Sequence, residues 1–452
     1  MENREKTTGG TDMMHGPLLG KILWFSLPLA ASSILQQLFN SADVAVVGRF
    51  AGSSALAAVG SSSAVINLLI NLFTGLSVGA NVVIAGYIGS GEKEKSRRAV
   101  HTSVMVAFLS GVFLLFLGIA VSKWVLIRMG TPADVLDEGI LYLRLYFLGM
   151  PFFMLYNFGS AVLRSKGDTR RPLYALLVSG IINVLLNLFF VIVFHMGVAG
   201  VAVATVIANG VSAALVCRCL AGEEEALRLC WKDLAIDRTE LIRIIRIGAP
   251  AGIQGLVFSL SNVCIQSGIN SFGSDAVAGS AAAINFEYFT YYTINAFVQA
   301  AVTFTSQNYG AGRYDRCKKV LGVCMCCAVG IAGAMSLIFV AGRESFIRIY
   351  AVDAAVVEYA MIRMFHVQLL EFMPAFYEVP GGALRGMGYS VLPSVISVLG
   401  SCGFRFVWIY TVFARVGGFG TLMNVYPATW ILTGTAMMTA CFLISRREFG
   451  KK

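Results

Sequence analysis

The sequence predicts an all-α integral membrane protein whose 12 transmembrane helices form two repeated six-helix bundles. Two observations support this fold class, the composition and an internal repeat. Of the 452 residues, 57% are hydrophobic and only 13% are charged, and the mean hydropathy is +0.73, which excludes an ordinary soluble domain. Only helices or closed barrels satisfy the backbone in lipid, and the apolar stretches are far too long for barrel strands.

The internal repeat has a spacing of 221 residues. The matched segments are Gly52-x-x-Ala-Leu-Ala with Gly273-x-x-Ala-Val-Ala, the turn at Gly89–Gly91 with Gly310–Gly312, and Leu163-Arg164 with Leu384-Arg385. Pro28 returns as Pro250, one residue out of step. Because each copy has an even number of spans, both copies share one orientation, and a transport pathway is expected at the seam between them.

Each half contains six mostly apolar stretches that reach the length of about 20 residues needed for a span. They cover 20–47, 55–88, 98–122, 134–163, 171–195 and 199–220, and then 240–270, 276–309, 318–341, 354–384, 391–413 and 420–444. The predicted domains are an N-terminal tail (1–17), a first bundle (18–221), a linker (222–239), a second bundle (240–445) and a C-terminal tail (446–452). The linker is expected to be a cytoplasmic connection or an interfacial helix.

The positive charges predict the orientation. With the N-terminus inside, 26 of the 35 Lys and Arg residues lie in inner segments and 6 lie in outer loops. Both termini are therefore expected to be cytoplasmic, in a multi-pass protein of the cytoplasmic (inner) membrane. The net charge of +10 reflects this bias, so no nucleic-acid surface is expected.

The motifs of enzymes and cofactor proteins are missing from the sequence. The ten cysteines lack paired zinc-ligand spacing and are expected to be small packing residues. The turn beginning at Gly89 does not have the spacing of a phosphate-binding loop. We therefore expect neither an enzyme nor a cofactor, and no metal other than a coupling ion.

Polar residues within the spans of the first half share helical faces. The first span carries Gln36, Asn40 and Asp43 on one face, and Pro28 upstream predicts a hinge. A carboxylate at membrane depth costs ~3 kcal/mol unless it is paired or solvated. Oxygens from other spans accompany Asp43 in the same half: Asn67, Asn71, Asn183, Asn187 and Thr205. One carboxylate with neutral oxygens suits Na⁺ or a proton, whereas the alternative role of these amides is to hold helices together.

The second half carries its own polar stripes. They comprise Asn262 and Gln266 on the seventh span, Tyr288, Tyr292, Asn295 and Gln299 on the eighth, and Glu371 and Glu378 on the tenth. Aromatic rings beside amides and carboxylates predict a pocket for flat organic cations, and the alternative is a polar helix–helix seam. Arg144 and Arg363 occupy matching places in the two halves and are expected to pair with carboxylates.

The chain resembles the multidrug and toxic compound extrusion (MATE) family over nearly its whole length. The resemblance is carried by these segments: Pro28 through Asp43-x-x-x-Val47-Gly48, Gly89-Ser90-Gly91, Leu163 through Thr169, Gln307 through Gly312, and Gly382 through Gly388. It implies two six-helix bundles forming a V, and export of cationic or amphipathic drugs in exchange for Na⁺ or H⁺.

The resemblance also implies roles for particular residues. Asp43 matches the acidic residue of a cation site in the N-terminal bundle, which includes residues matching Asn183, Asn187 and Thr205. Some members have Asp at the position of Asn187. Members with a sodium site in the second bundle carry Glu and Asp at positions matching Phe258 and about Pro374. Neither side chain here can bind a cation, so a second site would require Glu371 or Glu378 from another turn.

Three functions are compatible with a membrane protein of this composition. The favoured one is cation-coupled antiport of cationic or amphipathic compounds by a monomer embedded in membrane lipids. The runner-up is a flippase for lipids or lipid-linked oligosaccharides, which should present a basic cavity, whereas these stripes are neutral to acidic. An intramembrane enzyme would need a nucleophile or metal constellation at depth, and the sequence has none.

Overall fold

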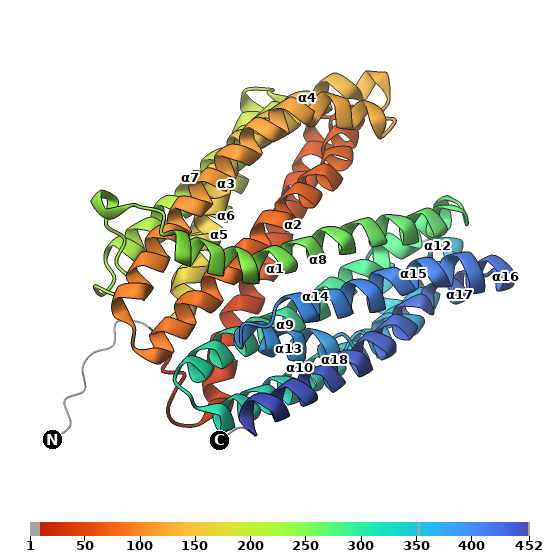
Figure 1. Cartoon of the computed structure of the whole chain (residues 1–452). Coiled ribbons are helices and arrows are strands. Elements are labelled where there is room, and N and C mark those ends of the chain that lie inside the picture. The colour runs from red at the N-terminus through yellow and green to blue at the C-terminus, as the bar shows by residue number, and fades with distance from the viewer. Residues whose placement is uncertain (1–9, 351–352, 451–452) are drawn as a thin grey trace. The chain divides into compact units, whose positions relative to one another are not determined.

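The chain is helical along nearly its whole length, as Figure 1 shows. The computed structural model describes residues 10–350 and 353–450. The first-half helices are α1 (Leu18–Phe50), α2 (Ser53–Ser90), α3 (Lys93–Arg128), α4 (Ala133–Leu148), α5 (Met150–Ser165), α6 (Arg170–Leu188), the π-helix η1 (Phe189–Val193) and α7 (Gly197–Ala221).

The second half repeats this order with more interruptions. After the short 3₁₀ helix η2 (Trp231–Asp233), its elements are α8 (Arg238–Asn270), α9 (Ser274–Gly310), α10 (Tyr314–Ala341), α11 (Arg343–Arg348), α12 (Ala354–His366), the 3₁₀ helix η3 (Gln368–Leu370), α13 (Ala375–Gly386), α14 (Val391–Ser397), the π-helix η4 (Val398–Gly403), α15 (Phe404–Trp408), the π-helix η5 (Ile409–Phe413), α16 (Ala414–Val416), α17 (Phe419–Met423) and α18 (Val425–Phe449).

Each of the 12 predicted spans coincides with a helical stretch, which confirms the all-α fold class. Among the described residues, nine helices are long and apolar enough to cross a membrane, and a tenth span is the bent pair α4–α5. The remaining stretches are α9 and the broken segment from α12 to α13. Both carry the polar residues that the sequence assigns to a pathway, and these residues lower their mean hydropathy.

Two predicted spans are broken in the structure where prolines interrupt the backbone ladder. The span predicted over 134–163 bends by 46° between α4 and α5, next to Pro151. The span predicted over 354–384 separates into α12, η3 and α13, and Pro374 precedes α13. Proline lacks a donor N–H and clashes with the carbonyl four residues earlier, so continuous hydropathy does not guarantee a continuous helix.

The 221-residue repeat is visible in the backbone conformation. Four pairs of glycines at this spacing have positive φ angles in both copies: Gly52 (95°) and Gly273 (91°), Gly91 (75°) and Gly312 (69°), Gly167 (94°) and Gly388 (90°), and Gly197 (54°) and Gly418 (81°). Side chains rarely tolerate this region, so glycine is required at these turns. The duplication therefore extends from the sequence to the connections between helices.

The contacts divide the chain into two compact units. Unit 1 comprises residues 1–15 and 27–252, and unit 2 comprises residues 16–26 and 253–452. The predicted linker at 222–239 is thus not where the units change, because α1 and α8 each contribute residues to both units. The division falls within two residues of Pro28 in α1 and within three residues of Pro250 in α8.

Each unit is organised around one central helix. In unit 1, α5 packs against α2, α3 and α7. In unit 2, α13 packs against α9, α10 and α18. These two central helices carry the repeated Leu163-Arg164 and Leu384-Arg385 segments, and both leucines are fully buried.

The linker forms part of unit 1 and contains only the one-turn helix η2 rather than an interfacial helix. Its Glu223 carboxylate is buried and pairs with Lys166 and Arg171. At its end, the Asp237 side chain accepts the backbone N–H groups of Thr239 (2.8 Å) and Glu240 (3.2 Å) at the start of α8. The N-terminal tail is also attached, because the Thr11 N–H donates to the Gly167 carbonyl at 3.2 Å.

Candidate ion-coupling site

A chain of hydrogen bonds joins Asp43, Asn187, Asn183 and Thr205 within unit 1. The Asn187 amide Nδ2 donates to Asp43 Oδ1 and also to Asn183 Oδ1 at 3.2 Å. Asn183 Nδ2 reaches Thr205 Oγ1 at 3.4 Å, and Thr205 donates to the Val201 carbonyl at 2.9 Å. The structure therefore brings together four predicted residues from α1, α6 and α7, up to 162 positions apart in the sequence.

A glycine on α6 allows α1 to approach the site. A Cβ added at Gly180 would lie only 1.9 Å from Cε2 of the Phe39 ring. Phe39 precedes Asp43 by one helical turn, and Gly180 precedes Asn183 by three residues, so this contact sets the spacing of the helices beside the site. Sequence reasoning missed both residues, because neither is polar.

The backbone hydrogen-bonding pattern of α6 changes from α-helical to π-helical just after Asn187. The helix ends at Leu188 and continues as the π-helix η1, which has one extra residue in its turn. π-Helical segments are rare and often occur at functional sites. The π-helix η5 lies 220 residues later, so the corresponding stretch of the second half has the same departure.

Two tyrosines of α4 complete the surroundings of Asp43. The hydroxyls of Tyr142 and Tyr146 lie within electrostatic range of its carboxylate, and their ring centroids are 5.9 Å apart. The helical spacing of the two tyrosines was visible in the sequence, but nothing in that spacing relates them to Asp43. Their proximity to Asp43 depends on how α4 packs.

One oxygen atom of the network has no partner. Asn187 is fully buried, and its Oδ1 atom accepts no hydrogen bond from the described residues. A buried acceptor without a donor costs about 1–3 kcal/mol, whereas a cation would satisfy it. The half-buried Asp43 carboxylate and this oxygen belong to neighbouring side chains, so the donor set is one charged and several neutral oxygens. Such oxygens suit a hard monovalent cation, or a proton on the carboxylate.

The other predicted polar residues of unit 1 are more open. Gln36 and Asn40 on α1 and Asn67 on α2 are exposed, and Asn71 is half-buried. In unit 2, Asn262 and Gln266 on α8 are also exposed. Their amides can bind solvent or a ligand in addition to protein.

The tyrosines of α9 form a flat surface. The rings of Tyr288 and Tyr292 stack with centroids 5.9 Å apart and an interplanar angle of 17°. Asn295 and Gln299 follow on the same helix and are half-buried. This partly open aromatic and amide surface is the type of surface that stacks on planar organic cations.

Glu371 and Glu378 differ from this open stripe, because both are buried inside unit 2. Glu378 lies near the Arg385 guanidinium, which donates to Gln254 at 2.6 Å. Glu371 lies within electrostatic range of Arg363 and Arg405, and its Oε2 atom accepts no hydrogen bond from the described residues. The two carboxylates therefore belong to a buried charge network rather than to the exposed surface of α9.

The expected pairing of Arg363 is found with Glu287. Its Nε and Nη2 atoms donate to the two Glu287 oxygens at 2.6 and 2.8 Å. Glu287 lies off the polar stripe of its helix, so the stripe did not identify it as the partner. Arg144, in contrast, is exposed and pairs with no carboxylate in the described part of the chain.

Phe258, which matches the Glu of family members with a sodium site in the second bundle, lies beside an arginine. The guanidinium carbon of Arg405 lies 5.7 Å from the Phe258 ring, and its Nη1 atom donates to Asn262 at 2.8 Å. A fixed positive charge beside Phe258 repels a second cation. This positive charge disfavours a cation site beside Phe258.

A cluster of His101, Cys230 and Asp233 brings metal-ligand atom types within 4.8 Å of one another. His101 donates from Nδ1 to the Arg97 carbonyl at 2.8 Å, and its Nε2 accepts the Cys230 N–H at 3.2 Å. Asp233 pairs with Arg97. Because both ring nitrogens are already engaged, these residues attach the linker to α3.

Comparison with known proteins gives a consistent result. The profile of the MatE family matches residues 28–189 and 250–411, two segments 222 residues apart. The probable multidrug resistance protein YoeA of Bacillus subtilis is 28% identical over 84% of this chain and 83% of its own length. The probable multidrug resistance protein NorM of Thermotoga maritima is also 28% identical, over 84% of this chain and 82% of its own.

Solved structures show the same fold. A MOP superfamily transporter from Pyrococcus furiosus superposes with a TM-score of 0.87, covering 99% of both chains at 22% sequence identity.

Proposed function

The chain belongs to the MatE family and is a membrane transporter of the multidrug efflux type, and from this premise we propose that it exports cationic or amphipathic compounds by antiport with Na⁺ or H⁺ bound at Asp43. The observation that carries the proposal is the hydrogen-bonded chain from Asp43 to Thr205, with its unsatisfied Asn187 oxygen. It places one carboxylate and several neutral oxygens on three helices of one unit, as an ion site requires.

Asn187 has two roles in this proposal. Without an ion, its Nδ2 donates to Asp43 and stabilises the negative carboxylate. When a cation arrives, rotation of the amide presents Oδ1 in place of Nδ2. The same side chain thus contacts Asp43 in the empty site and the cation in the loaded site. Its rotation changes the contact between α1, which carries Asp43, and α6, which carries Asn187.

Each unit is proposed to contribute its own open polar residues to substrate binding: Gln36, Asn40, Asn67 and Asn71 in unit 1, and Asn262, Gln266, Tyr288, Tyr292, Asn295 and Gln299 in unit 2. The stacked tyrosines support recognition of planar cations. Glu371 and Glu378 are proposed to act behind this surface rather than on it, because both are buried beside arginines.

The α1 proline supports alternation between two states. Pro28 lies where α1 passes from unit 2 to unit 1, and Pro250 lies at the corresponding place in α8. Both helices can therefore bend where their packing environment changes. By linkage, ion and drug must weaken each other's affinity by the same factor.

The test is dye transport into proteoliposomes with sodium and proton gradients imposed separately. The wild type should move a fluorescent cationic dye under one of the two gradients, and Asp43→Asn should abolish this movement. Asp137→Asn removes an exposed carboxylate of α4 and serves as the matched control, which should transport normally. Normal gradient-driven transport by Asp43→Asn, or drug affinity that is flat across both a pH and a sodium series, would overturn the proposal.

A further inference from the structure

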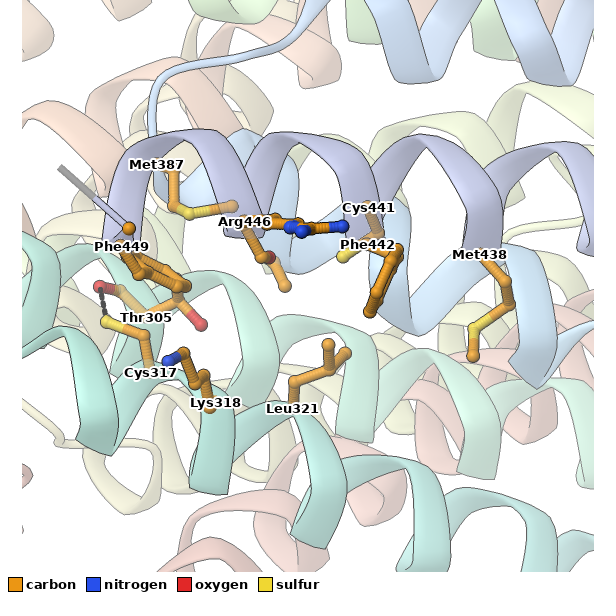
Figure 2. Close-up of a pocket in the computed structure, with 13 residues that line it drawn as sticks. Thr305, Cys317, Lys318, Leu321, Met387, Met438, Cys441, Phe442, Arg446 and Phe449 are labelled. Carbon is orange, nitrogen blue, oxygen red and sulfur yellow. Dashed lines mark hydrogen bonds between the residues drawn. The ribbon is translucent and has the colours of Figure 1, made fainter.

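A pocket lies inside unit 2, and its lining residues are distinct from those of the proposed ion and substrate sites. Its volume is about 500 Å³, and it is formed where α9 and α13 end, α10 begins and α18 ends. Figure 2 shows α18 and α10 facing each other across it, with Met438 at one end and Phe449 at the other. The sequence predicts that this end of the helices is cytoplasmic.

The interior of the pocket is apolar and long. Its floor contains the buried residues Ala383, Met387 and Cys441, and its wall includes Phe442. From Met438 to Phe449 it follows 12 residues of α18, and the 11 steps between them correspond to ~16 Å at 1.5 Å per residue. This is about half of the ~30 Å hydrocarbon core, which is the depth of one membrane leaflet.

Two cations line the pocket beside this apolar surface. Arg446 has no carboxylate partner in the described part of the chain. Lys318 lies 3.7 Å from the highly exposed Asp315 and 5.4 Å from the centre of the Phe449 ring. Figure 2 places Arg446 on α18 opposite Lys318 on α10. Among the described residues, one unpaired arginine and one lysine whose only ion pair is with a highly exposed carboxylate lie at the mouth of an apolar groove, and together they complement an anion with a hydrocarbon chain.

A buried hydroxyl lines the same pocket without a partner. Thr305 is 1% exposed, and its Oγ1 atom has no hydrogen-bond partner among the described residues, although its carbonyl accepts a weak bond from Cys317 Sγ. Leaving a hydroxyl unpaired inside protein is unfavourable, so the atom is expected to bind a polar group of a ligand.

We propose that this pocket binds an anionic membrane lipid, with its phosphate on Lys318 and Arg446, an ester oxygen on Thr305 Oγ1 and an acyl chain along α18. The lipid enters from the membrane, because Met438 and Phe442 are exposed on the side of α18. Bound there, it connects the ends of α9, α10, α13 and α18. Its positive lining distinguishes this pocket from the proposed path for cationic drugs.

The experiment is native mass spectrometry of the purified full chain with phosphatidylglycerol and, separately, phosphatidylcholine. The wild type should retain phosphatidylglycerol, whereas the double variant Lys318→Gln/Arg446→Gln should bind it about 30-fold more weakly, because each basic residue near an anionic lipid contributes about a fivefold factor. The matched control is Lys319→Gln/Arg447→Gln, which removes the adjacent charges that do not line the pocket. It should bind like the wild type.

A third variant tests the hydroxyl. Thr305→Val has nearly the same shape and should weaken phosphatidylglycerol binding several-fold without lowering the thermal stability of the lipid-free protein, since Oγ1 has no bond to lose. Equal losses in both double variants, equal retention of phosphatidylcholine, or displacement by glycerol phosphate without acyl chains would each overturn the proposal. None of these outcomes depends on dye transport, so the result is independent of the ion site.

Discussion

The contact between Gly180 and Phe39 predicts that one methyl group will disrupt ion coupling. In Gly180→Ala the new Cβ would lie 1.9, 2.2 and 2.3 Å from three atoms of the Phe39 ring. Carbon atoms pack at about 3.5 Å, so the ring must retreat by about 1.5 Å. Phe39 is half-buried and one turn from Asp43, so this movement carries the carboxylate away from Asn187.

The magnitude follows from the interaction that the ion-loaded site loses. Once displaced, the Asp43 carboxylate can no longer share a cation with the Asn187 Oδ1 atom, and an interaction between a charged and a polar group contributes about 1.5–3 kcal/mol, which corresponds to roughly a 10- to 100-fold change in affinity. Overpacking adds about 1–3 kcal/mol of destabilisation. We therefore expect the ion concentration for half-maximal dye transport to rise at least about tenfold, with a smaller change in drug affinity.

The assay is gradient-driven dye uptake across an ion series, with thermal unfolding measured in parallel. Gly210→Ala is the matched control, because a Cβ there meets nothing within 4 Å, and alanine favours the helix by about 0.5–1 kcal/mol. Adding Phe39→Ala to Gly180→Ala removes the ring and should restore ion dependence. If Gly180→Ala keeps normal ion dependence, or if the double variant is no better than the single one, the packing argument is refuted.

Three further predictions concern other parts of the chain. Arg363→Met should lower the free energy of unfolding by about 3–5 kcal/mol because it strands the buried Glu287 charge, and adding Glu287→Leu should recover much of this loss in detergent unfolding measurements. Pro28→Ala should slow turnover while leaving equilibrium drug binding nearly unchanged, and faster transport would contradict the hinge. The pKa of Asp237 lies below its usual value because its carboxylate accepts the Glu240 N–H and further donors. The ionised carboxylate therefore stabilises the folded protein fully above the unfolded pKa of about 3.9, and this stabilisation is lost as the pH falls through the folded pKa. The stability difference between the wild type and Asp237→Asn should thus be constant near neutral pH and shrink in strong acid, and a difference that grows on acidification would refute this.

The helices were predictable because hydropathy and helical periodicity are local properties. All 12 spans and the 221-residue repeat were legible in the sequence, and the repeated glycines have positive φ angles where the repeat places them. The breaks beside Pro151 and Pro374 were not predicted, because a proline can bend, end or merely interrupt a helix according to what packs around it.

The candidate ion site was predictable only as a set of residue types. A costly carboxylate at Asp43 and amides at Asn183 and Asn187 stand out in apolar helices. The contribution of Tyr142, the contact of Phe39 and the unpaired state of the Asn187 oxygen could not be read in this way. These features depend on the rotation and depth of each helix.

The sequence by itself determined the membrane class, the all-helical fold, the duplication and the inventory of polar groups, because each follows from composition or from spacing along one helix. Only the tertiary structure decided which groups meet: Asp43 with Asn187 across 144 positions, and Glu287 with Arg363 across 76. It also placed Thr305 in a pocket with Lys318 and Arg446. The physical reason is that contacts between helices are set by close packing at a few small residues, such as Gly180 against Phe39, and one sequence contains many residues that could pack in this way.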